Sequence, residues 1–417
     1  MRTWKTAVST YFKPSVWMVL LLGFSCGLPL SLVFGSLSYW LKTSGIALAA
    51  IGYFSLVRTP YSLKFLWAPL VDRIPIPGLS RKFGQRRSWA LVFQIGLIAS
   101  VWGLSLLHPA DHLGLTAVLA CSVAFFSASQ DIVVDALRID SLTKDEQGPG
   151  AGAYQLGYRI GMLMSGAGGL WLASVTSWNT AYQVVGCLVF VGLITVLCMK
   201  EQPTDKPKAL RGAWMQEMLI QPFKDFMKHN GWFWILLFVV LYKINNAVLG
   251  VMAGPFYLEI GFSEKEIAAV SNMWGSAATI LGTLLGGVIV VRFGVMRCLW
   301  VLGFVEIFTS LGYAGQAAIG YDLSYLVGLI AFDNIVGGMG NTVFVAYLSL
   351  LCSKKYTTTQ YALLSSLAMV ARDVFASNGG VLAAHLGWIH FFILTGALMM
   401  PGLVLLYYMR RRFGDGA

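Results

Sequence analysis

Apolar stretches about as long as a membrane-spanning helix follow one another along nearly the whole chain. A helix needs roughly 20 predominantly apolar residues to cross a bilayer. The 417 residues are 57% hydrophobic and only 12% charged, which is far from the balance of a soluble globular domain. The stretches are also too long, and alternate too little, for the strands of a membrane barrel. The sequence therefore predicts an all-α, multi-pass protein of the lipid bilayer.

Twelve stretches are candidates for transmembrane helices. The first follows a basic N-terminal segment, as the apolar part of a signal peptide would, but its full span length and the lack of a convincing cleavage site indicate a helix that is retained. The predicted spans are Val16–Trp40, Ile51–Leu70, Trp89–Leu107, Leu113–Ile139, Ala151–Val175, Tyr182–Cys198, Trp232–Leu258, Ile267–Val291, Cys298–Ile319, Leu323–Leu351, Tyr361–Ala384 and Trp388–Met409.

Lysine and arginine side chains outside the spans are divided unequally between the two sets of loops. Both termini and the loops after the even-numbered spans hold nearly all of them, whereas the opposite loops hold only Lys42 and Lys265. By the positive-inside rule, both termini are expected on the cytoplasmic side. The net charge of +11 is therefore a topology signal and gives no reason to expect a nucleic-acid partner. The cysteines and histidines lack ligand spacing, so we expect no metal site and no cofactor.

The only long polar interruption covers residues 200–230, between the sixth and seventh spans. It divides the chain into an N-terminal six-helix bundle (1–199) and a C-terminal six-helix bundle (231–417). Two such halves, with a solute site near the midplane between them, are the arrangement of the major facilitator fold. Within the linker, WMQEMLIQPFKDFMK (214–228) places its apolar side chains mostly on one side. This pattern indicates a short amphipathic helix on the cytoplasmic membrane face, with a poorly ordered connector as the alternative.

The loop after the second span, PLVDRIPIPGLSRKFGQRRSW, resembles the signature loop of the major facilitator family. An Asp-Arg pair, here Asp72-Arg73, is followed by a glycine and by paired basic residues, here Arg86 and Arg87, across a longer spacer than is common. The resemblance implies a charge latch between helix ends in one access state. Positive-inside loop charge alone would explain the arginines but not Asp72.

The fourth span carries charges in the stretch SASQDIVVDALRID (127–140). Asp131, Asp135 and Arg138 are spaced so that they share one helix face with Ser127. Each charge costs about 2.5–3.5 kcal/mol inside a membrane, so this face is not expected to contact lipid. Asp140 lies near the cytoplasmic end and is expected in water.

Further polar side chains occur on spans of both halves. A cavity lined by several cations, amides and tyrosines suits a sizeable solute with carboxylates or phosphates and many hydroxyl groups. Salt bridges that lock helices are the alternative, and they explain Asp135 with Arg138, or Arg372 with Asp373, equally well. Glu306 is expected to be an interior polar contact or a residue of the cavity mouth. The candidate solute-binding residues are Arg58, Tyr61, Lys64, Gln130, Tyr158, Arg159, Lys243, Asn246, Asn334 and Arg372.

The run FFSASQDIVVDA (125–136) is very similar to the corresponding run of AmpG muropeptide permeases. LGFSCGLPLSL (22–32), KFLWAPLVDR (64–73), LGYRIGMLMSG (156–166), LYKINNA (241–247) and GGMGN (337–341) extend the similarity over both halves. The resemblance implies an inner-membrane transporter that imports N-acetylglucosaminyl-1,6-anhydro-N-acetylmuramyl peptides (anhydromuropeptides) from the periplasm for peptidoglycan recycling. It also implies a proton-driven, monomeric protein whose transport feeds β-lactamase induction in bacteria that have that circuit.

Proton coupling needs a partly buried carboxylate that exchanges its proton near the working pH. Asp131 is the first candidate because it lies deepest in the fourth span, and Asp135, Asp333 and Asp373 are the others.

Two alternatives differ in substrate or in class. Acetyl-coenzyme A transporters share a QDI-type fourth helix, so another bulky anion, such as an acyl-coenzyme A or a nucleotide-linked sugar, is the second transport hypothesis. A membrane-embedded enzyme or a receptor would be a different class of protein. The sequence contains neither the HExxH motif nor a phosphate-binding GxxxxGKS loop, so we predict a secondary active transporter and no enzyme.

Overall fold

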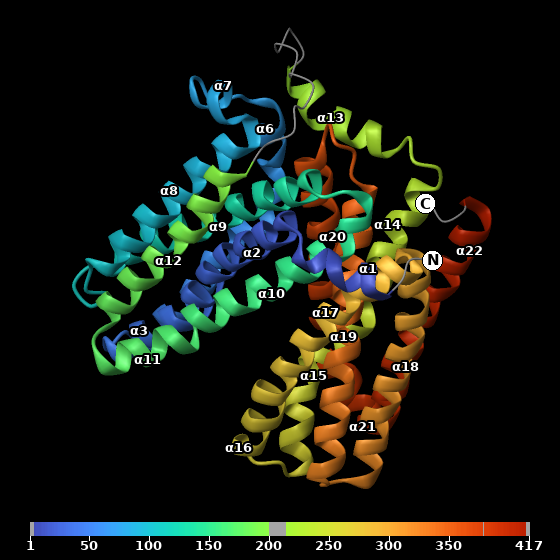
Figure 1. The fold of residues 1–417 in the computed structure, drawn as a ribbon. Coiled ribbons are helices and arrows are strands. Elements are labelled where there is room, and N and C mark those ends of the chain that lie inside the picture. The colour runs from blue at the N-terminus through green and yellow to red at the C-terminus, as the bar shows by residue number, and fades with distance from the viewer. Residues whose placement is uncertain (1–3, 200–213, 378, 414–417) are drawn as a thin grey trace.

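The computed structural model describes residues 4–199, 214–377 and 379–413. Helices make up nearly all of these residues, and no strand occurs among them. Figure 1 shows two groups of helices, one from each half of the sequence, that meet in the upper part of the view and diverge toward the lower part. We call α1–α12 the N-terminal half and α14–α22 the C-terminal half.

The N-terminal half begins with a short segment that precedes the first span. Its elements are α1 (Trp4–Ser9), η1 (Thr10–Phe12), α2 (Pro14–Ser31), η2 (Leu32–Ser36), α3 (Leu37–Thr43), α4 (Leu48–Tyr53), η3 (Phe54–Arg58), α5 (Thr59–Leu63), η4 (Lys64–Leu66), α6 (Ala68–Arg73), α7 (Leu79–Phe83), α8 (Gln85–Ser105), α9 (Leu113–Ser141), η5 (Lys144–Glu146), α10 (Gln147–Ser165), α11 (Ala167–Val175) and α12 (Trp178–Cys198).

One helix, α13 (Trp214–Phe226), lies between the halves in the sequence. The elements of the C-terminal half are α14 (Trp232–Leu241), α15 (Ile244–Ile260), α16 (Glu264–Ile267), η6 (Ala268–Trp274), α17 (Gly275–Phe293), α18 (Val295–Ile319), α19 (Leu323–Leu351), α20 (Thr357–Ser377), α21 (Gly379–Leu398) and α22 (Met400–Phe413).

Over the residues that the structure describes, all twelve predicted spans are helical. Nine helices among the described residues are long and apolar enough to cross a membrane by length and composition. The second, fifth and eleventh predicted spans are helical as well but are interrupted or more polar: the second is divided into α4–α6, the fifth is α10 followed by α11, and the eleventh includes α20. A bend at Gly387, where φ is +69°, separates the eleventh span from the twelfth within α21.

Helices α2 and α10 pack unusually close together because glycines face each other. A Cβ on Gly23 would come within 2.1 Å of the Tyr154 carbonyl oxygen, and one on Gly157 within 2.0 Å of the Leu20 carbonyl oxygen. Gly23 opens the run GFSCG, which matches the GxSxG spacing of hydrolase nucleophiles. Here the run is helical and its Ser25 is fully buried, so its glycines serve helix packing. Helices α17 and α19 form an equivalent close pair in the C-terminal half.

The connections after α6, α9, α17 and α19 lie with α13 at one end of the molecule, which we call the basic end (Figure 1). Helix α13 contacts both α6 and α20, and the buried Gln360 donates through Nε2 to the Pro222 carbonyl at 3.1 Å. The linker therefore contains the helix that the sequence predicts, and this helix lies against both halves at this end. Its contact with a membrane surface stays a prediction, and residues 200–213 of the linker lie outside the described residues.

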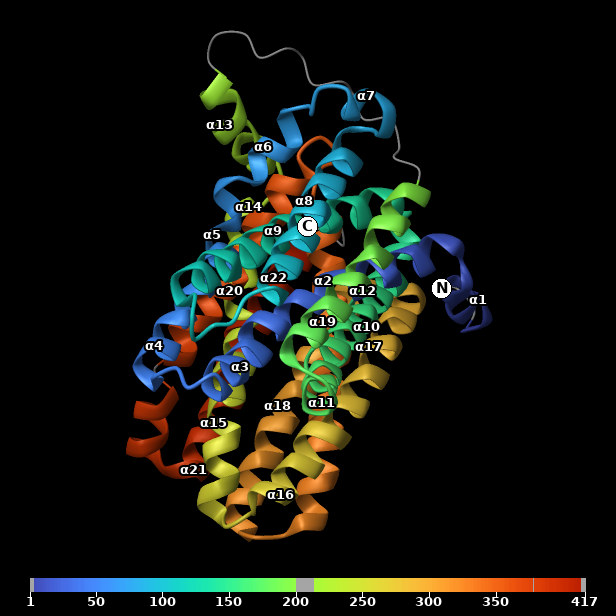
Figure 2. The same ribbon diagram turned by 90° about the vertical axis from the view of Figure 1, so that its left-hand side faces the viewer.

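The N-terminal segment, α1 with η1, crosses from one half to the other at the basic end (Figure 2). The Tyr11 hydroxyl donates to the Leu284 carbonyl at 2.7 Å. Lys13 Nζ lies 2.7 Å from Glu146 Oε1 in the N-terminal half. Burial of the Glu146 carboxyl raises its pKa, but hydrogen bonds from Lys13 and from the backbone of Thr143 outweigh this and lower the pKa below its usual value. The segment therefore joins the two halves.

Candidate functional site

The charged face of α9 points toward the C-terminal half. Asp131 and Asp135 are buried, with 7% and 6% of their surface exposed. Asp135 Oδ1 lies 3.3 Å from Arg138 Nη2, and Arg138 Nη1 donates to Ser349 Oγ of α19 at 3.0 Å. Both aspartates also act electrostatically on the Tyr361 hydroxyl of α20. The fourth-span charges therefore face the interface between the halves.

Lys64 is a second cation close to these aspartates. It begins η4, between two short helices of the interrupted second span, and is buried, with 6% of its surface exposed. Its ammonium attracts both Asp131 and Asp135 electrostatically. Asp135 thus has two cations, Lys64 and Arg138, whereas Asp131 has Lys64 alone and keeps Oδ1 without a hydrogen-bond partner. Asp131 is therefore the less tightly held of the two carboxylates.

A second cluster lies on the C-terminal half. Lys243 sits at the break between α14 and α15, where its ammonium donates to Asn341 Oδ1 at 3.1 Å. Asn341 Nδ2 in turn donates to Gln155 Oε1 of α10 at 2.7 Å. Asn246 Nδ2 donates to Glu306 Oε2 at 3.2 Å, which makes Glu306 an interior polar contact, one of the two roles expected for it. Lys243 therefore lies at the interface and is connected to the other half.

The remaining candidates on the N-terminal half have different surroundings. The Tyr61 hydroxyl donates to Ser127 Oγ at 2.7 Å on the charged face of α9. The Arg58 guanidinium is exposed and lies 4.7 Å from the centre of the Phe34 ring. Tyr158 and Arg159 are half-buried on α10. Gln130 is fully buried, and its amide contacts α2 through Ser25 and Cys26, so the structure places it inside the N-terminal half.

Of the candidates on the C-terminal half, Asp333 and Asn334 make hydrogen bonds within that half, whereas Arg372 is exposed. Asp333 Oδ2 accepts a hydrogen bond from the Tyr313 hydroxyl at 3.1 Å, inside the half. Asn334 Oδ1 accepts one from Thr279 Oγ1 at 2.7 Å and joins α19 to α17. Arg372 is exposed on α20 and repels Lys243 electrostatically. The side chain of Asp373 lies outside the described part of the structure.

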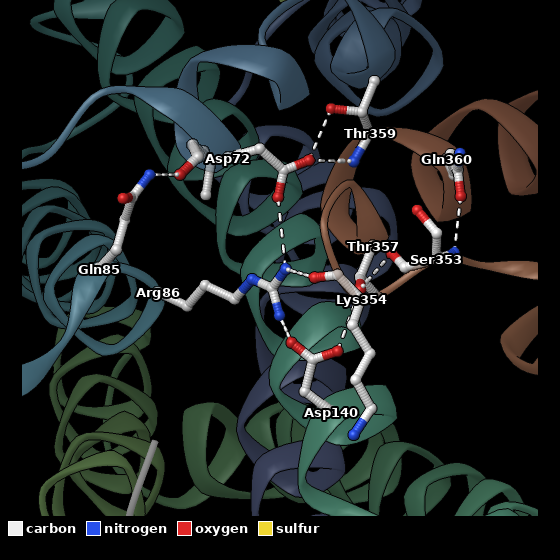
Figure 3. A network of polar contacts seen from close by, with 10 residues as sticks. Asp72, Gln85, Arg86, Asp140, Ser353, Lys354, Thr357, Thr359 and Gln360 are labelled. Carbon is white, nitrogen blue, oxygen red and sulfur yellow. Dashed lines mark hydrogen bonds and ion pairs between the residues drawn. The ribbon is translucent and has the colours of Figure 1, made fainter. Parts of the chain in front are cut away.

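The predicted latch residue Asp72 caps the first turn of α20 (Figure 3). Its Oδ2 accepts hydrogen bonds from the Thr359 backbone N–H at 2.8 Å and from Thr359 Oγ1 at 2.7 Å. Because a helix N-terminus carries unpaired N–H groups and partial positive charge, an aspartate is well suited to this position. Asp72 therefore binds the N-terminal half to the C-terminal half.

Arg86 is the centre of the same network (Figure 3). Its guanidinium forms an ion pair with Asp140 and lies 3.6 Å from Asp72 Oδ1. It also donates to the Lys354 carbonyl at 3.2 Å, and Asp140 Oδ1 accepts a hydrogen bond from Thr357 Oγ1 at 3.0 Å. Asp140, which we expected in water, is instead bound to Arg86 and Thr357, because the connection between α19 and α20 covers the end of α9.

The other two latch candidates behave differently from each other. Arg73 Nη2 donates to the Tyr356 hydroxyl at 3.0 Å, across the interface. Arg87 donates to the carbonyls of Val196 and Leu197, within the N-terminal half. Ala68 of α6, Ile132 of α9 and Ala362 of α20 form a small buried apolar cluster that contains residues of both halves.

Sequence reasoning missed the partners of these residues. Thr359, Tyr356, Ser349 and Gln155 each complete a contact between the halves. A run of three threonines before an apolar helix is a signal for a helix start, and it could have pointed to Thr357–Thr359. Among the described residues, no group of three or more His, Cys, Asp or Glu side chains is placed to hold a metal ion.

Comparison with known proteins places these features in a family. Residues 19–376 match the profile described as Major Facilitator Superfamily. The chain is 38% identical over 404 residues to the anhydromuropeptide permease of Escherichia coli, covering 96% of this chain and 80% of that protein. It is 35% identical over 399 residues to a candidate transporter, AmpG 4, of Rickettsia felis, covering 94% and 96% respectively.

Solved structures show the same fold at low sequence identity. The proton:xylose symporter XylE superimposes with a TM-score of 0.68 at 12% identity, over 98% of this chain and 96% of that one. A bacterial homologue of the iron transporter ferroportin, in an outward-facing state, also gives 0.68, at 16% identity, over 95% and 99%. Two six-helix bundles with twelve transmembrane helices are therefore the architecture of this chain.

Proposed function

The chain belongs to the AmpG family of the Major Facilitator Superfamily and is a transporter, and from this premise we propose that it imports anhydromuropeptides into the bacterial cytoplasm. The substrates would be N-acetylglucosaminyl-1,6-anhydro-N-acetylmuramic acid with or without its stem peptide. The main support is the 38% identity over 96% of the chain to a protein named as an anhydromuropeptide permease. Import would serve peptidoglycan recycling and, where that circuit exists, β-lactamase induction.

The charges at the interface fit such a substrate. A muropeptide stem carries several carboxylates, and Lys64 and Lys243 face the interface from opposite halves. Arg159 and Arg372 are candidates for further carboxylate contacts, and Arg58, Tyr61, Tyr158, Asn246 and Asn334 are candidates for polar contacts. A cation of each half bound to one substrate would couple binding to the movement of the halves.

The positive-inside rule gives the direction. With the basic end in the cytoplasm, both termini are cytoplasmic and the protein lies in the inner membrane as a monomer. The contacts of Asp72 and Arg86 then close the cytoplasmic side, so this conformation is outward-facing. Asp72, Arg73 and Arg86 form the gate, and Arg87 supports it from within the N-terminal half.

A proton would drive the import. Asp131 is our first candidate for the proton carrier, because it has one cation, Lys64, and an oxygen without a hydrogen-bond partner. Asp135 is paired with Arg138 and assists Asp131 through its neighbouring negative charge. Asp333 and Asp373 are the next candidates for the proton carrier.

Uptake of labelled anhydromuropeptide into proteoliposomes, with and without an inward proton gradient, tests the proposal. We expect accumulation only with the gradient. Accumulation of an acyl-coenzyme A, with no uptake of the muropeptide, would favour the alternative substrate class. Uptake that is equal with and without the gradient would contradict proton coupling.

A further inference from the structure

Glu306 on α18 is a buried carboxylate that the proposed transport cycle does not use. Only 2% of its surface is exposed, and its hydrogen bond from Asn246 is made by a neutral amide. The neighbouring helix leaves room for it, because a Cβ on Gly340 would come within 2.7 Å of Oε1. One neutral donor offsets only part of the cost of a charge inside a membrane. Glu306 therefore needs either a cation or a proton.

Lys243 is the cation within electrostatic reach. It attracts Glu306, but its ammonium donates to Asn341 and lies 4.8 Å from the centre of the Phe344 ring. Lys243 therefore has two competing partners. Its ammonium is hydrogen-bonded to the Asn341 amide, and the Glu306 carboxylate also attracts it. Because an ion pair stabilises an ionised carboxylate, the position of Lys243 decides whether Glu306 favours a proton.

Asn341 links the position of Lys243 to the contact between the two halves. Its Oδ1 binds Lys243, and its Nδ2 donates to Gln155, which belongs to the other half. The amide is therefore oriented by a partner that moves relative to it whenever α10 separates from α19. Separation of the halves at the basic end removes Gln155 and releases Asn341 from its present orientation.

We propose that Glu306 is a proton-binding carboxylate of the C-terminal half, and that Gln155 and Asn341 make its proton affinity depend on which end is closed. With the basic end closed, Asn341 holds Lys243 and Glu306 takes a proton from the water of the open side. When the basic end opens, Lys243 moves to Glu306 and the proton leaves to the water on that side. The direction of the proton rests on the proposed import function.

Three further groups act on Glu306 or on Lys243. Asp333 on α19 repels the ionised form of Glu306, and the Tyr242 hydroxyl at the end of α14 interacts with it. Arg372 on α20 repels Lys243. On the far side of α18, α21 packs through Gly396 against Ile307 and Ser310, which carry no charge. Lys243 is the cation among the groups acting on Glu306.

Infrared difference titration of the purified full chain tests this site without any substrate. We expect the wild-type protein to show a titrating buried carboxyl band that is missing in Glu306→Gln and present in the control Glu259→Gln, whose side chain is exposed in the same half. Gln155→Leu should move the midpoint of this band to lower pH by about one unit, because Lys243 is then free to approach Glu306. An identical spectrum in wild type and Glu306→Gln would overturn the proton site, and an unchanged midpoint in Gln155→Leu would overturn its link to the interface.

Transport assays supply the second measurement. In Glu306→Gln, substrate exchange without a gradient should continue, while gradient-driven accumulation should fall at least tenfold. Full accumulation would overturn the proposal. If Glu306→Gln fails to fold, Glu306→Asp keeps the carboxylate and should retain the band with a shifted midpoint; loss of any shift would count against the site. A normal titration without muropeptide uptake in any variant would reject the proposed substrate and still support Glu306 as the proton site.

Discussion

Asp131 on the fourth span and Lys64 on the second are a buried carboxylate and a buried ammonium that attract each other. Removing one partner of such a pair typically costs 3–5 kcal/mol, because the other charge stays buried without compensation. A proton or a substrate carboxylate can take the place of the missing partner. Single substitutions here therefore report both on stability and on transport, and each needs a measurement that separates the two.

Asp131→Asn should abolish gradient-driven accumulation and leave part of the substrate binding. The asparagine keeps the size and one acceptor of the aspartate but cannot exchange a proton. Accumulation in proteoliposomes and binding by calorimetry measure the two effects separately. Accumulation at the wild-type level in this variant would remove Asp131 from the proton pathway and leave Glu306, Asp333 and Asp373 as the carboxylates to test.

Lys64→Ala should weaken binding of a peptide-bearing muropeptide at least tenfold, because a charge-assisted hydrogen bond contributes about 1.5–3 kcal/mol. The peptide-free disaccharide is the matched control, since it lacks the stem carboxylates. The double variant Lys64→Ala with Asp131→Asn removes the uncompensated carboxylate and so separates binding from stability. Unchanged affinity for both ligands would assign Lys64 a locking role.

At the scale of the helices, short contacts at the ends of α20 and α1 hold the halves together. Asp72 binds the first turn of α20, and the N-terminal segment reaches α17 through Tyr11. Each of these two contacts consists of one or two hydrogen bonds, so its loss should shift the balance between closed and open forms without unfolding either half.

Asp72→Ala should raise the open-to-closed ratio at the basic end about two- to thirty-fold, because loss of a helix cap costs about 0.5–2 kcal/mol. Spin labels on cysteines at the exposed positions Arg81 and Lys355 would measure the distance across this end. The control is Asp111→Ala, an exposed aspartate of the opposite end. Equal distance distributions in wild type and Asp72→Ala would contradict the latch.

Tyr11→Phe should shift the same distance distribution about two- to tenfold toward the open form, because a buried hydrogen bond contributes about 0.5–1.5 kcal/mol. The ring stays in place and only the bond to the Leu284 carbonyl is lost. Tyr53→Phe, at an exposed tyrosine, is the control. If the two variants behave alike, the N-terminal segment does not contribute to closure.

The spans and the charged face of α9 could be predicted because hydropathy and helical spacing are local properties. The break at Lys243 could not, since LYKINNA contains neither proline nor glycine to mark it. Partners such as Thr359 for Asp72, or Ser349 for Arg138, lie 287 and 211 residues away in the sequence. Such pairs depend on how the two halves pack together. The charged face of α9 was therefore predictable, and the residues that contact it were not.

At the scale of the whole molecule, Ala68 and Ala362 come from different halves and share one buried contact layer with Ile132. Two of these three side chains are alanines, which let the two bundles approach closely. Because Ala68 and Ala362 come from opposite halves, the proposed movement of the halves would have to open this cluster.

A disulfide between Ala68→Cys and Ala362→Cys, with the six native cysteines replaced, should stop transport, because the bundles could no longer separate. Reduction should restore it. Uptake before and after reduction is the measurement, and each single-cysteine variant is its control. Undiminished uptake after complete cross-linking would show that this layer stays closed during transport.

The contact made by the N-terminal segment also fixes the order of folding events during biosynthesis. Tyr11 binds a carbonyl 273 residues further along the chain. At a synthesis rate of about 5–20 residues per second, this partner leaves the ribosome roughly 15–55 s after the tyrosine does. The first bundle must therefore enter the membrane and hold its shape while its own N-terminus is undocked, and the docking of that N-terminus can follow only after much of the second bundle has been made.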